Sequence, residues 1–197
     1  MIPVSNIRFS KLEKKNNQHD IIYLSLNNNS IYLNLPKLKC PFGITKFKYN
    51  NIDKYSLNIS LDKNINANIY RSLLNVDDWV DDNFFQNKQW LQKLNIDFKS
   101  SKKTIQTYSK PIISENNGFP PYINLKLIFD HNGKFYCDIF HHKSGKLQKL
   151  NNIQDIQHLL NNTNLCVSSK IVISNVWIMD KKYGVTLKPK KIVFYDK

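Results

Sequence analysis

The chain has 197 residues, of which 41% are hydrophobic and 12% aromatic. This is enough apolar material for a folded core, and it excludes wholesale disorder. The net charge of +14 at pH 7 favours a polyanionic partner, either nucleic acid or an anionic membrane surface. Nearly all of the positive charge is lysine, since Arg8 and Arg71 are the only arginines. Lysine binds phosphate as a point charge, whereas arginine reads guanine edges, so the balance favours backbone binding without sequence preference. An AT-rich genome would also enrich lysine, and composition leaves that explanation open.

The first half of the chain predicts strands. Residues 21–26 and 31–35 flank an NNNS turn and predict a hairpin, and residues 54–61 alternate as a half-buried strand. Between them, KLKCPFGITKFKYN (residues 37–50) interleaves lysines with aromatic residues around a Pro-Phe-Gly break. The break predicts a turn between two strands, with Lys46 and Lys48 lining the edge of a groove. The aromatic residues that follow these lysines, Phe47 and Tyr49, point to the opposite side as core or as stacking rings, and both interpretations stay open.

A helical segment interrupts the strands at about residues 66–98. Apolar residues recur there at helical spacing and predict two helices with a break near residues 81–83. The segment contains the acidic stretch DDWVDD (residues 77–82), whose carboxylates cap helix N-termini in one interpretation. In the other interpretation they dock a partner or compete for a nucleic-acid groove.

After residue 102 the alternation returns, and it predicts strands at 104–113, 122–129, 135–141, 170–179 and 183–194, with a short helix at 153–160. A three-residue loop at residues 131–133, with Gly133 left-handed, predicts that strands 122–129 and 135–141 form a hairpin. This register is preferred because the shorter turn would bury Asp138 beside leucines. One face of the hairpin then carries the following side chains, with Lys126 opposite Asp138: Tyr122, Asn124, Lys126, Ile128, Tyr136, Asp138, Phe140 and His142. This face is either a stacking platform for unpaired bases or a second core layer under the helical segment.

The C-terminal strand contains Lys188, Lys190 and Lys191. In an extended chain Lys188 and Lys190 share one face, and Lys191 points to the other. Pro189 cannot donate a ladder hydrogen bond, so this part of the strand is expected at an edge or a bulge. Five or more short strands with one helical segment predict a mainly β fold. We expect an OB-fold-like five- to seven-stranded barrel or a curved antiparallel sheet, in one domain over residues 1–197.

Several sequence phrases, in order, carry a family resemblance. They are LPKLKCPFGITKF, KYSLNISLD, YSKPII, FPPYINLKL, KLNNIQDIQHLL and YGVTLKPKKIVF. Together they resemble the single-stranded-DNA-binding proteins of large DNA viruses of eukaryotes, which are related to those of short-tailed phages. The resemblance implies an OB-fold that coats unwound DNA during replication, with no catalytic signature. It places family positions at Pro41, Phe42, Gly43, Tyr108, Lys110 and the Pro120-Pro121-Tyr122 entry to a strand. Family members often end in an acidic tail, whereas this chain ends in the basic stretch LKPKKIVFYDK.

Signatures of catalysis and metal binding are absent from the sequence. There is no phosphate-binding glycine loop, and the adjacent His141 and His142 would point to opposite faces of a strand. The DDWVDD carboxylates could hold a divalent ion for a nuclease, but the surroundings lack a third carboxylate and a phosphate-clamping arginine. The three cysteines are far apart without a C-x-x-C pair, which suits a reducing compartment with buried thiols. We therefore expect a protein without enzymatic activity, metal or cofactor.

We expect a sequence-independent single-stranded-DNA-binding protein of viral replication, recombination or repair. It would act inside the cell, in a viral factory of the host cytoplasm or in the nucleus, because no signal peptide or membrane span is evident. One alternative is a structural virion protein that uses an OB-like barrel for protein contacts, and another is a binder of duplex nucleic acid or RNA. The expected partners are single-stranded DNA, replication proteins such as a polymerase or helicase-primase, and further copies of the chain, but no membrane. The expected nucleic-acid-binding residues are Lys46, Lys48, Tyr108, Lys110, Tyr122, Lys126, Tyr136, Phe140, Lys188 and Lys190.

Overall fold

The chain was analysed as a computed structural model that describes residues 2–16, 19–97, 99–115, 118 and 120–196. It divides into two compact units, each built from discontinuous segments. Unit 1 comprises residues 1–31, 67–112 and 173–186, and unit 2 comprises residues 32–66, 113–172 and 187–197. Two long strands, β12 (Cys166–Met179) and β13 (Lys182–Tyr195), contribute residues to both units. The expectation of a single domain stays a prediction.

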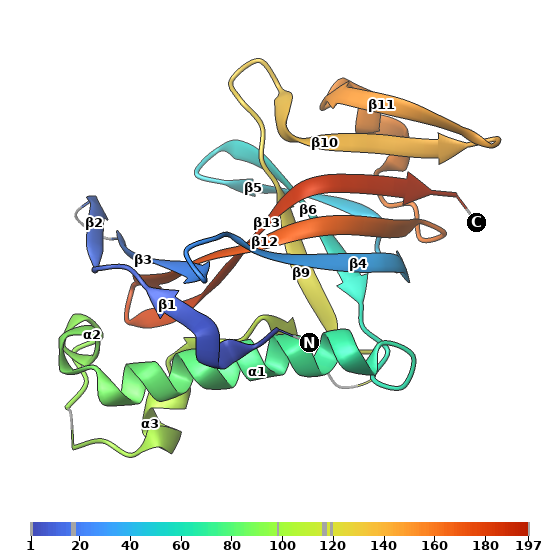
Figure 1. Ribbon diagram of the computed structural model, residues 1–197. Coiled ribbons are helices and arrows are strands. Elements are labelled where there is room, and N and C mark those ends of the chain that lie inside the picture. Colours follow the sequence, from blue (N-terminus) through green and yellow to red (C-terminus); the bar gives the residue numbers. More distant parts are fainter. Residues whose placement is uncertain (1, 17–18, 98, 116–117, 119, 197) are drawn as a thin grey trace. The chain divides into compact units, whose positions relative to one another are not determined.

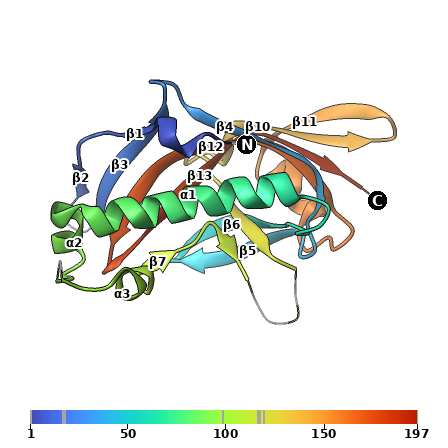
Figure 2. The ribbon, with the colours of Figure 1, turned by 60° about the horizontal axis from the view of Figure 1, so that its bottom comes forward.

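Unit 1 combines a small sheet with helices. Strand β3 (His19–Leu26) pairs antiparallel with β1 (Ile7–Phe9), with β2 (Glu13–Asn16) and with residues 175–178 of β12. The start of β13 pairs parallel with the two-residue strand β7 (Ser109–Lys110). The helices are α1 (Ala67–Gln86), α2 (Lys88–Lys93) and α3 (Lys102–Gln106), and a 3₁₀ turn, η1 (Val4–Asn6), precedes β1. Figure 2 shows the long helix α1 with α2 following at its C-terminal end.

The apolar stripe of α1 explains why the helix is held in unit 1. Leu73, Val76, Val80 and Phe84 recur at helical spacing and are buried. The Phe84 ring stacks on Tyr183 of β13, with ring centroids 3.8 Å apart. The predicted helical segment is confirmed, but the break is not at residues 81–83. The helical segment is interrupted at Asn87, between α1 and α2. The Asn87 side chain accepts hydrogen bonds from the backbone N–H groups of residues 89 and 90 and so caps α2.

The DDWVDD stretch does not cap a helix N-terminus, because it lies in the second half of α1. Asp77 and Asp81 are buried, and each accepts a hydrogen bond within unit 1. The Asp77 carboxylate accepts from the backbone N–H of Ile112 at 2.8 Å, and the Asp81 carboxylate accepts from the Tyr183 hydroxyl at 2.8 Å. Two of these four carboxylates are therefore inside the unit, and the capping interpretation is wrong.

Unit 2 contains two sheets. One is antiparallel, in the order β5 (Ile44–Tyr49), β6 (Ile52–Ser60), β9 (Tyr122–Leu127), β8 (Ile113–Ser114). The other, which we call the larger sheet, contains β4 (Ile31–Lys39), β10 (Lys134–Lys143) and β11 (Lys146–Asn152), together with the unit 2 parts of β12 and β13. Its strand order is β4-β12-β13-β10-β11, and β10 runs parallel to β13. Figure 1 shows β10 and β11 side by side in orange, and the 3₁₀ helix η2 (Gln154–Leu159) follows β11.

The predicted fold class is confirmed: the structure is mainly β with a helical segment, and its sheets are curved and open. Of the two forms expected from the sequence, the curved sheet is therefore observed and the closed barrel is not. The short helix expected at 153–160 is the 3₁₀ helix η2. The strand expected at 104–113 is wrong at its start, because residues 102–106 form α3 with Ser101 as the capping residue.

The Pro-Phe-Gly break turns the chain between β4 and β5, as predicted. The backbone N–H of Gly43 donates to the Cys40 carbonyl at 2.9 Å, and the Cys40 N–H donates to the Leu165 carbonyl at 2.9 Å. Gly43 has φ +60°, and a Cβ atom built on it would lie 2.5 Å from the backbone nitrogen of Asn162. Only glycine fits both the left-handed backbone and this close approach.

The hairpin predicted from residues 122–129 and 135–141 forms only near its turn. There Phe129 pairs with Phe135 in the predicted register, flanked by backbone hydrogen bonds from Asp130 to Lys134 and from Tyr136 to Ile128. The rest of the predicted pairing is wrong, because β9 and β10 enter different sheets. Lys126 therefore pairs with Ser56 of β6, and Asp138 forms an ion pair with Lys149 of β11 at 3.1 Å. The hairpin expected from residues 21–26 and 31–35 is also wrong, because β3 and β4 each pair with β12.

Candidate nucleic-acid interface

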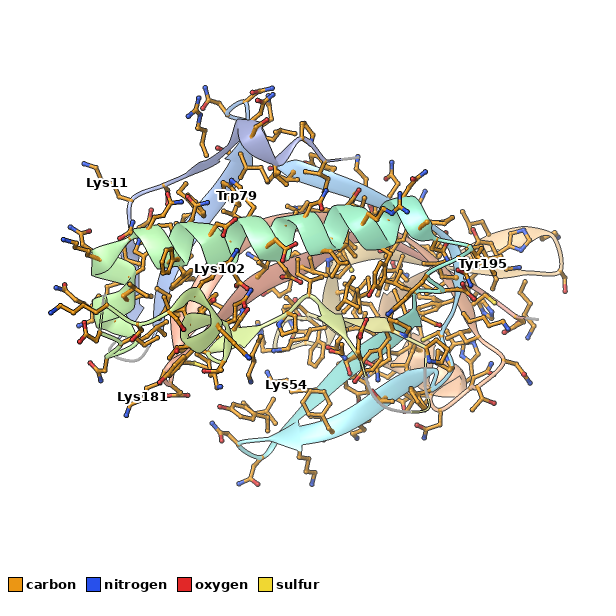
Figure 3. The ribbon with its side chains drawn as sticks, turned by 90° about the horizontal axis from the view of Figure 1, so that it is seen from below. Lys11, Lys54, Trp79, Lys102, Lys181 and Tyr195 are labelled. Carbon is orange, nitrogen blue, oxygen red and sulfur yellow. The ribbon has the colours of Figure 1, made fainter. Side chains whose placement is uncertain are left out.

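The outer face of the antiparallel sheet in unit 2 combines exposed rings with lysines. In the β5–β6 ladder, Phe47 lies opposite Lys54, and in the β6–β9 ladder Ser56 lies opposite Lys126. Laterally paired residues share a face, so Phe47, Tyr49, Lys54 and Lys126 all project from the same side. The Phe47 side chain is 42% exposed and that of Tyr49 is 61% exposed. We call these four residues the platform; Lys54 is labelled in Figure 3, where it projects from β6.

The two platform rings are spaced for stacking. Phe47 and Tyr49 are two residues apart on one strand, which places their Cα atoms roughly 7 Å apart along β5. The neighbouring positions on the same face are polar, since the Thr45 and Ser56 hydroxyls lie 3.0 Å apart and satisfy each other. None of the described residues that alternate onto this face in β5, β6 and β9 is acidic. The platform can therefore take a planar base and an adjacent phosphate without electrostatic repulsion.

A basic cleft adjoins the platform at the end of β9. Ile128, two residues beyond Lys126, lines this cleft with Tyr136, Lys188 and Lys190, and the cleft has a volume of about 100 Å³. The Tyr136 backbone N–H donates to the Ile128 carbonyl at 3.0 Å, and the Tyr136 side chain is 71% exposed. We call Ile128, Tyr136, Lys188 and Lys190 the basic cleft.

The basic cleft agrees with what the C-terminal strand predicted. Lys188 and Lys190 line the same cleft, whereas Lys191 lies over the Phe140 ring, with its ammonium 5.1 Å from the ring centroid. β13 is an inner strand between β12 and β10, so the expected edge position is wrong for the strand as a whole. Pro189 falls between the residues of β13 that pair with β7 and those that pair with β10, where a residue without an N–H is tolerated.

A half-buried thiol, Cys137, forms part of the cleft wall. Burial raises the pKa of Cys137 to about 11, and the nearby Lys190 ammonium acts in the opposite direction. The thiol is therefore protonated and uncharged at neutral pH, and it does not offset the lysine charges of the cleft.

Two of the expected binding residues, Lys46 and Lys48, are not on the platform. They project from the opposite side of β5, where Lys46 forms an ion pair with Asp53 at 2.8 Å. The Asp53 carboxylate, as a hydrogen-bond partner, raises the pKa of Lys46 above its ordinary value. Both lysines are exposed, but Lys46 already has a carboxylate partner.

Tyr108 and Lys110 belong to unit 1, whereas the other eight expected residues belong to unit 2. The Tyr108 ring lies under the Lys182 ammonium, 5.6 Å from its centroid, and Lys110 lies 6.0 Å from the Trp177 ring centroid. These are further lysine–aromatic pairs, and both lie within unit 1, which does not contain the platform or the basic cleft.

The two remaining expected residues, Tyr122 and Phe140, lie on different sheets. Tyr122 is half-buried at the start of β9, on the platform side and opposite Ser60. Phe140 is half-buried on β10, in the larger sheet. The structure thus gathers Lys126, Tyr136, Lys188 and Lys190 of the expected set into the platform and the adjoining cleft.

Sequence reasoning missed three residues of this surface or left them undecided. Phe47 and Tyr49 were as compatible with a core as with stacking, and Lys54 was placed only at the start of a half-buried strand. The signal that could have identified them is that Tyr55, Leu57 and Ile59 already supply one complete apolar face of the β6 strand. The neighbouring strand then needs few further core residues beyond Ile44.

Charge is concentrated in the unit that carries this surface. Unit 2 holds 16 lysines and 7 acidic residues, a net charge of +9, whereas unit 1 holds 13 basic and 8 acidic residues, a net charge of +5. Both arginines of the chain are in unit 1, so every positive side chain in unit 2 is a lysine apart from histidine.

In the described part of the chain, no group of three or more histidine, cysteine, aspartate or glutamate side chains is arranged to hold a metal ion. No helix among the described residues is long and apolar enough to span a membrane.

Comparisons with known proteins find similarity among solved structures but not among family models or curated sequences. No protein-family model and no curated protein sequence matches the chain. Among solved structures, the chain is similar to the single-stranded DNA-binding protein from bacteriophage Enc34 in a C-terminally truncated form. The two share 12% sequence identity, the match covers 95% of this chain and 96% of that chain, and the TM-score is 0.45. At this level of similarity, function has to be argued from the surface of this chain itself.

Proposed function

We propose that the chain binds single-stranded DNA without sequence preference, through the platform and the basic cleft. The observation that carries this proposal is the pair of exposed rings, Phe47 and Tyr49, beside Lys54 and Lys126 on a face without carboxylates. Unpaired bases stack on exposed rings whatever their identity, and lysines neutralise the phosphates between them. A duplex offers the platform only its phosphates, because its bases are already stacked.

We also propose a biological setting. The chain acts without catalysis in viral DNA replication, recombination or repair, in the host cytoplasm or nucleus, together with replication proteins and further copies of itself. The support for this setting is the order of the six sequence phrases described above. It is independent of the platform, so the two proposals are tested separately.

The test measures binding of a fluorescent oligo-dT by anisotropy at several salt concentrations, beside the matching duplex and the matching RNA. We expect the single strand to bind more tightly than the duplex, with a slope of log K against log salt of about −0.7 for each phosphate neutralised. Replacing Phe47 and Tyr49 together by alanine is expected to weaken binding by about 2–6 kcal/mol, since each stacked base contributes roughly 1–3 kcal/mol.

A matched control separates stacking from a general loss of surface rings. Phe85 of α1 is 42% exposed, as Phe47 is, and it lies in unit 1. Phe85→Ala is expected to leave binding unchanged. Wild-type affinity in the Phe47→Ala/Tyr49→Ala variant would show that the platform is not the DNA site. If the wild-type chain binds no single strand at all and instead purifies with capsid components, the virion-protein alternative is correct.

A further inference from the structure

A second surface of unit 2 also combines rings and lysines, on the larger sheet. Three aromatic rings there each have a lysine ammonium over them. Lys170 lies 4.5 Å from the Tyr32 ring centroid, Lys37 lies 4.7 Å from that of Tyr195, and the Lys191–Phe140 distance is 5.1 Å. These distances are within the range of cation–π attraction. We call these six residues the second face; Tyr195 is labelled in Figure 3.

The three pairs lie on one side of the larger sheet. On β12, Ser168 and Lys170 are two residues apart and share a face, and the Ser168 hydroxyl lies 3.1 Å from the Tyr195 hydroxyl. On β13, Tyr195 and Lys191 are four residues apart and also share a face. The parallel ladder places Lys191 beside Asp138 of β10, two residues from Phe140 on the same side.

The register also fixes the extent of the second face. It runs from β4 across β12 and β13 to β10, which is three strand-to-strand steps or roughly 14 Å. The Tyr32 side chain is 50% exposed, and Tyr195 and Phe140 are half-buried, so all three rings can be reached from solvent. The ladder partners of β10 extend this side by Leu147 and Lys149 of β11, of which Leu147 is exposed.

The charge of the second face favours an anionic partner. Lys37, Lys170 and Lys191 are exposed, and the carboxylate beside them, Asp138, is already paired with Lys149 at 3.1 Å. Each lysine ammonium lies over its ring, so a base that displaces it and stacks on that ring would have the positive charge next to its phosphate. A folded acidic protein would use the charges but would leave the exposed rings without a planar partner.

We propose that the second face binds a second segment of single-stranded DNA, separate from the segment on the platform. This inference rests on the proposed function, since it assigns a further site for the same class of ligand. The chain would then hold two stretches of unpaired DNA per molecule, either from one strand that returns or from two strands. The shared chemistry is aromatic stacking plus lysine neutralisation of phosphates.

The experiment counts bound oligonucleotides on the full chain. An oligo-dT of about six nucleotides, near the lower end of the site sizes of such proteins, is titrated at low salt, and the stoichiometry is read by native mass spectrometry and calorimetry. The wild-type chain is expected to bind two oligonucleotides. A variant with Lys37, Lys170 and Lys191 changed to glutamine is expected to bind one, and on a long oligo-dT its salt slope is expected to fall by about 2, or 0.7 for each lost contact.

A charge-matched control changes Lys14, Lys103 and Lys181 to glutamine, all of which are exposed and in unit 1. It is expected to bind two oligonucleotides. A single-ring variant, Tyr32→Ala, which removes a half-exposed side chain without changing the charge, is expected to weaken the second binding event at least fivefold.

The outcomes separate this inference from the proposed function. If the second-face variant still binds two oligonucleotides with the wild-type salt slope, the second face is not a DNA site. If Phe47→Ala/Tyr49→Ala abolishes all binding, a single site on the platform explains the data, and the inference is overturned while the proposed function stands. If the platform variant keeps both oligonucleotides and the second-face variant loses one, the second face is a DNA site and the platform assignment is wrong.

Discussion

Removing the Tyr183 hydroxyl tests how α1 is fixed in unit 1. The Tyr183 side chain is fully buried, and its hydroxyl donates to the Asp81 carboxylate at 2.8 Å while its ring stacks on Phe84. Tyr183→Phe keeps the ring and the stacking but leaves a buried carboxylate without one of its donors. A hydrogen bond to a charged group contributes about 1.5–3 kcal/mol, so we expect the free energy of unfolding to fall by that amount at pH 7.

The loss depends on pH with a definite sign. Burial raises the pKa of Asp81 above its ordinary value, and the hydrogen bond from Tyr183 acts against this rise. A carboxyl group whose pKa is raised in the folded state stabilises the fold fully below its unfolded pKa, and this contribution is lost as the pH rises through the folded pKa. Tyr183→Phe removes a hydrogen bond that lowers this pKa, so the folded pKa rises further and the cost is larger above the folded pKa than below it. When Asp81 is protonated, below about pH 4, the cost should shrink toward that of a neutral hydrogen bond, about 0.5–1.5 kcal/mol.

Tryptophan fluorescence is a selective assay, because Trp79, Trp90 and Trp177 all lie in unit 1. Urea unfolding followed by this signal gives the free energy, and for a chain of this length the melting temperature should fall by about 3–12 °C. Tyr49→Phe removes an exposed hydroxyl and should change the free energy by less than about 0.5 kcal/mol. A cost in Tyr183→Phe that is absent at pH 7, or equally large at pH 7 and pH 4, would refute the buried carboxylate–hydroxyl account.

Three further predictions concern the Gly43 turn, the basic cleft and the buried Cys40 thiol. Gly43→Ala should destabilise unit 2 by about 2 kcal/mol or more in chemical unfolding, because it adds a close contact to a left-handed backbone, whereas Gly145→Ala has open space around it and should cost about 1 kcal/mol. Changing Lys188 and Lys190 together to glutamine should lower the magnitude of the salt slope on oligo-dT by about 1.4; an unchanged slope would place the basic cleft outside the DNA path. Burial raises the pKa of Cys40 to about 12, so iodoacetamide at pH 8 should not alkylate it in the folded chain, and mass spectrometry of the modified peptide would show otherwise if the thiol were accessible.

The alternation of apolar and polar residues predicted which side chains of a strand point inward. It did so even in β9 and β10, for which the predicted strand pairing was wrong. In β9, Ile123, Leu125 and Leu127 are buried and Lys126 is exposed, as the alternation indicated. In β10, likewise, Ile139 is buried and the preceding residue, Asp138, is exposed. An apolar face can be read from one strand because burial acts on each side chain separately.

Pairing partners could not be predicted in the same way, because they depend on where the whole core lies. The loop after β9 has the predicted left-handed Gly133, at φ +78°. However, Asp130 closes the turn by accepting hydrogen bonds from the backbone N–H groups of Asn132 and Lys134. Beyond the Phe129–Phe135 bridge, β9 satisfies its backbone with β6 and β8, and β10 with β11 and β13.

The platform shows a second limit of sequence reasoning. In β5 one side carries lysines and the other carries aromatic residues, so the pattern alone leaves open whether the rings are core or surface. In the structure both sides of β5 beyond Ile44 are exposed: Phe47 and Tyr49 on one side, and on the other Lys46, which pairs with Asp53. Where a strand extends beyond the hydrophobic core, both of its faces can be exposed to solvent. The alternation of its residues then no longer indicates which side chains are buried.

The distribution of basic residues limits the kind of recognition that unit 2 can perform. Both surfaces proposed to bind DNA lie in the unit that has 16 lysines and no arginine. Specific contacts to guanine most often use the two-pronged arginine side chain, which can make paired hydrogen bonds to a base edge, whereas a lysine ammonium on a phosphate carries no sequence information. Rings such as Phe47 and Tyr32 stack on any base, since every base has a π-face. Affinity for mixed-sequence oligonucleotides of equal length should therefore vary little at matched salt. A preference of about 100-fold for one sequence corresponds to roughly 2.7 kcal/mol of base-edge recognition, and these lysine and aromatic surfaces do not account for it.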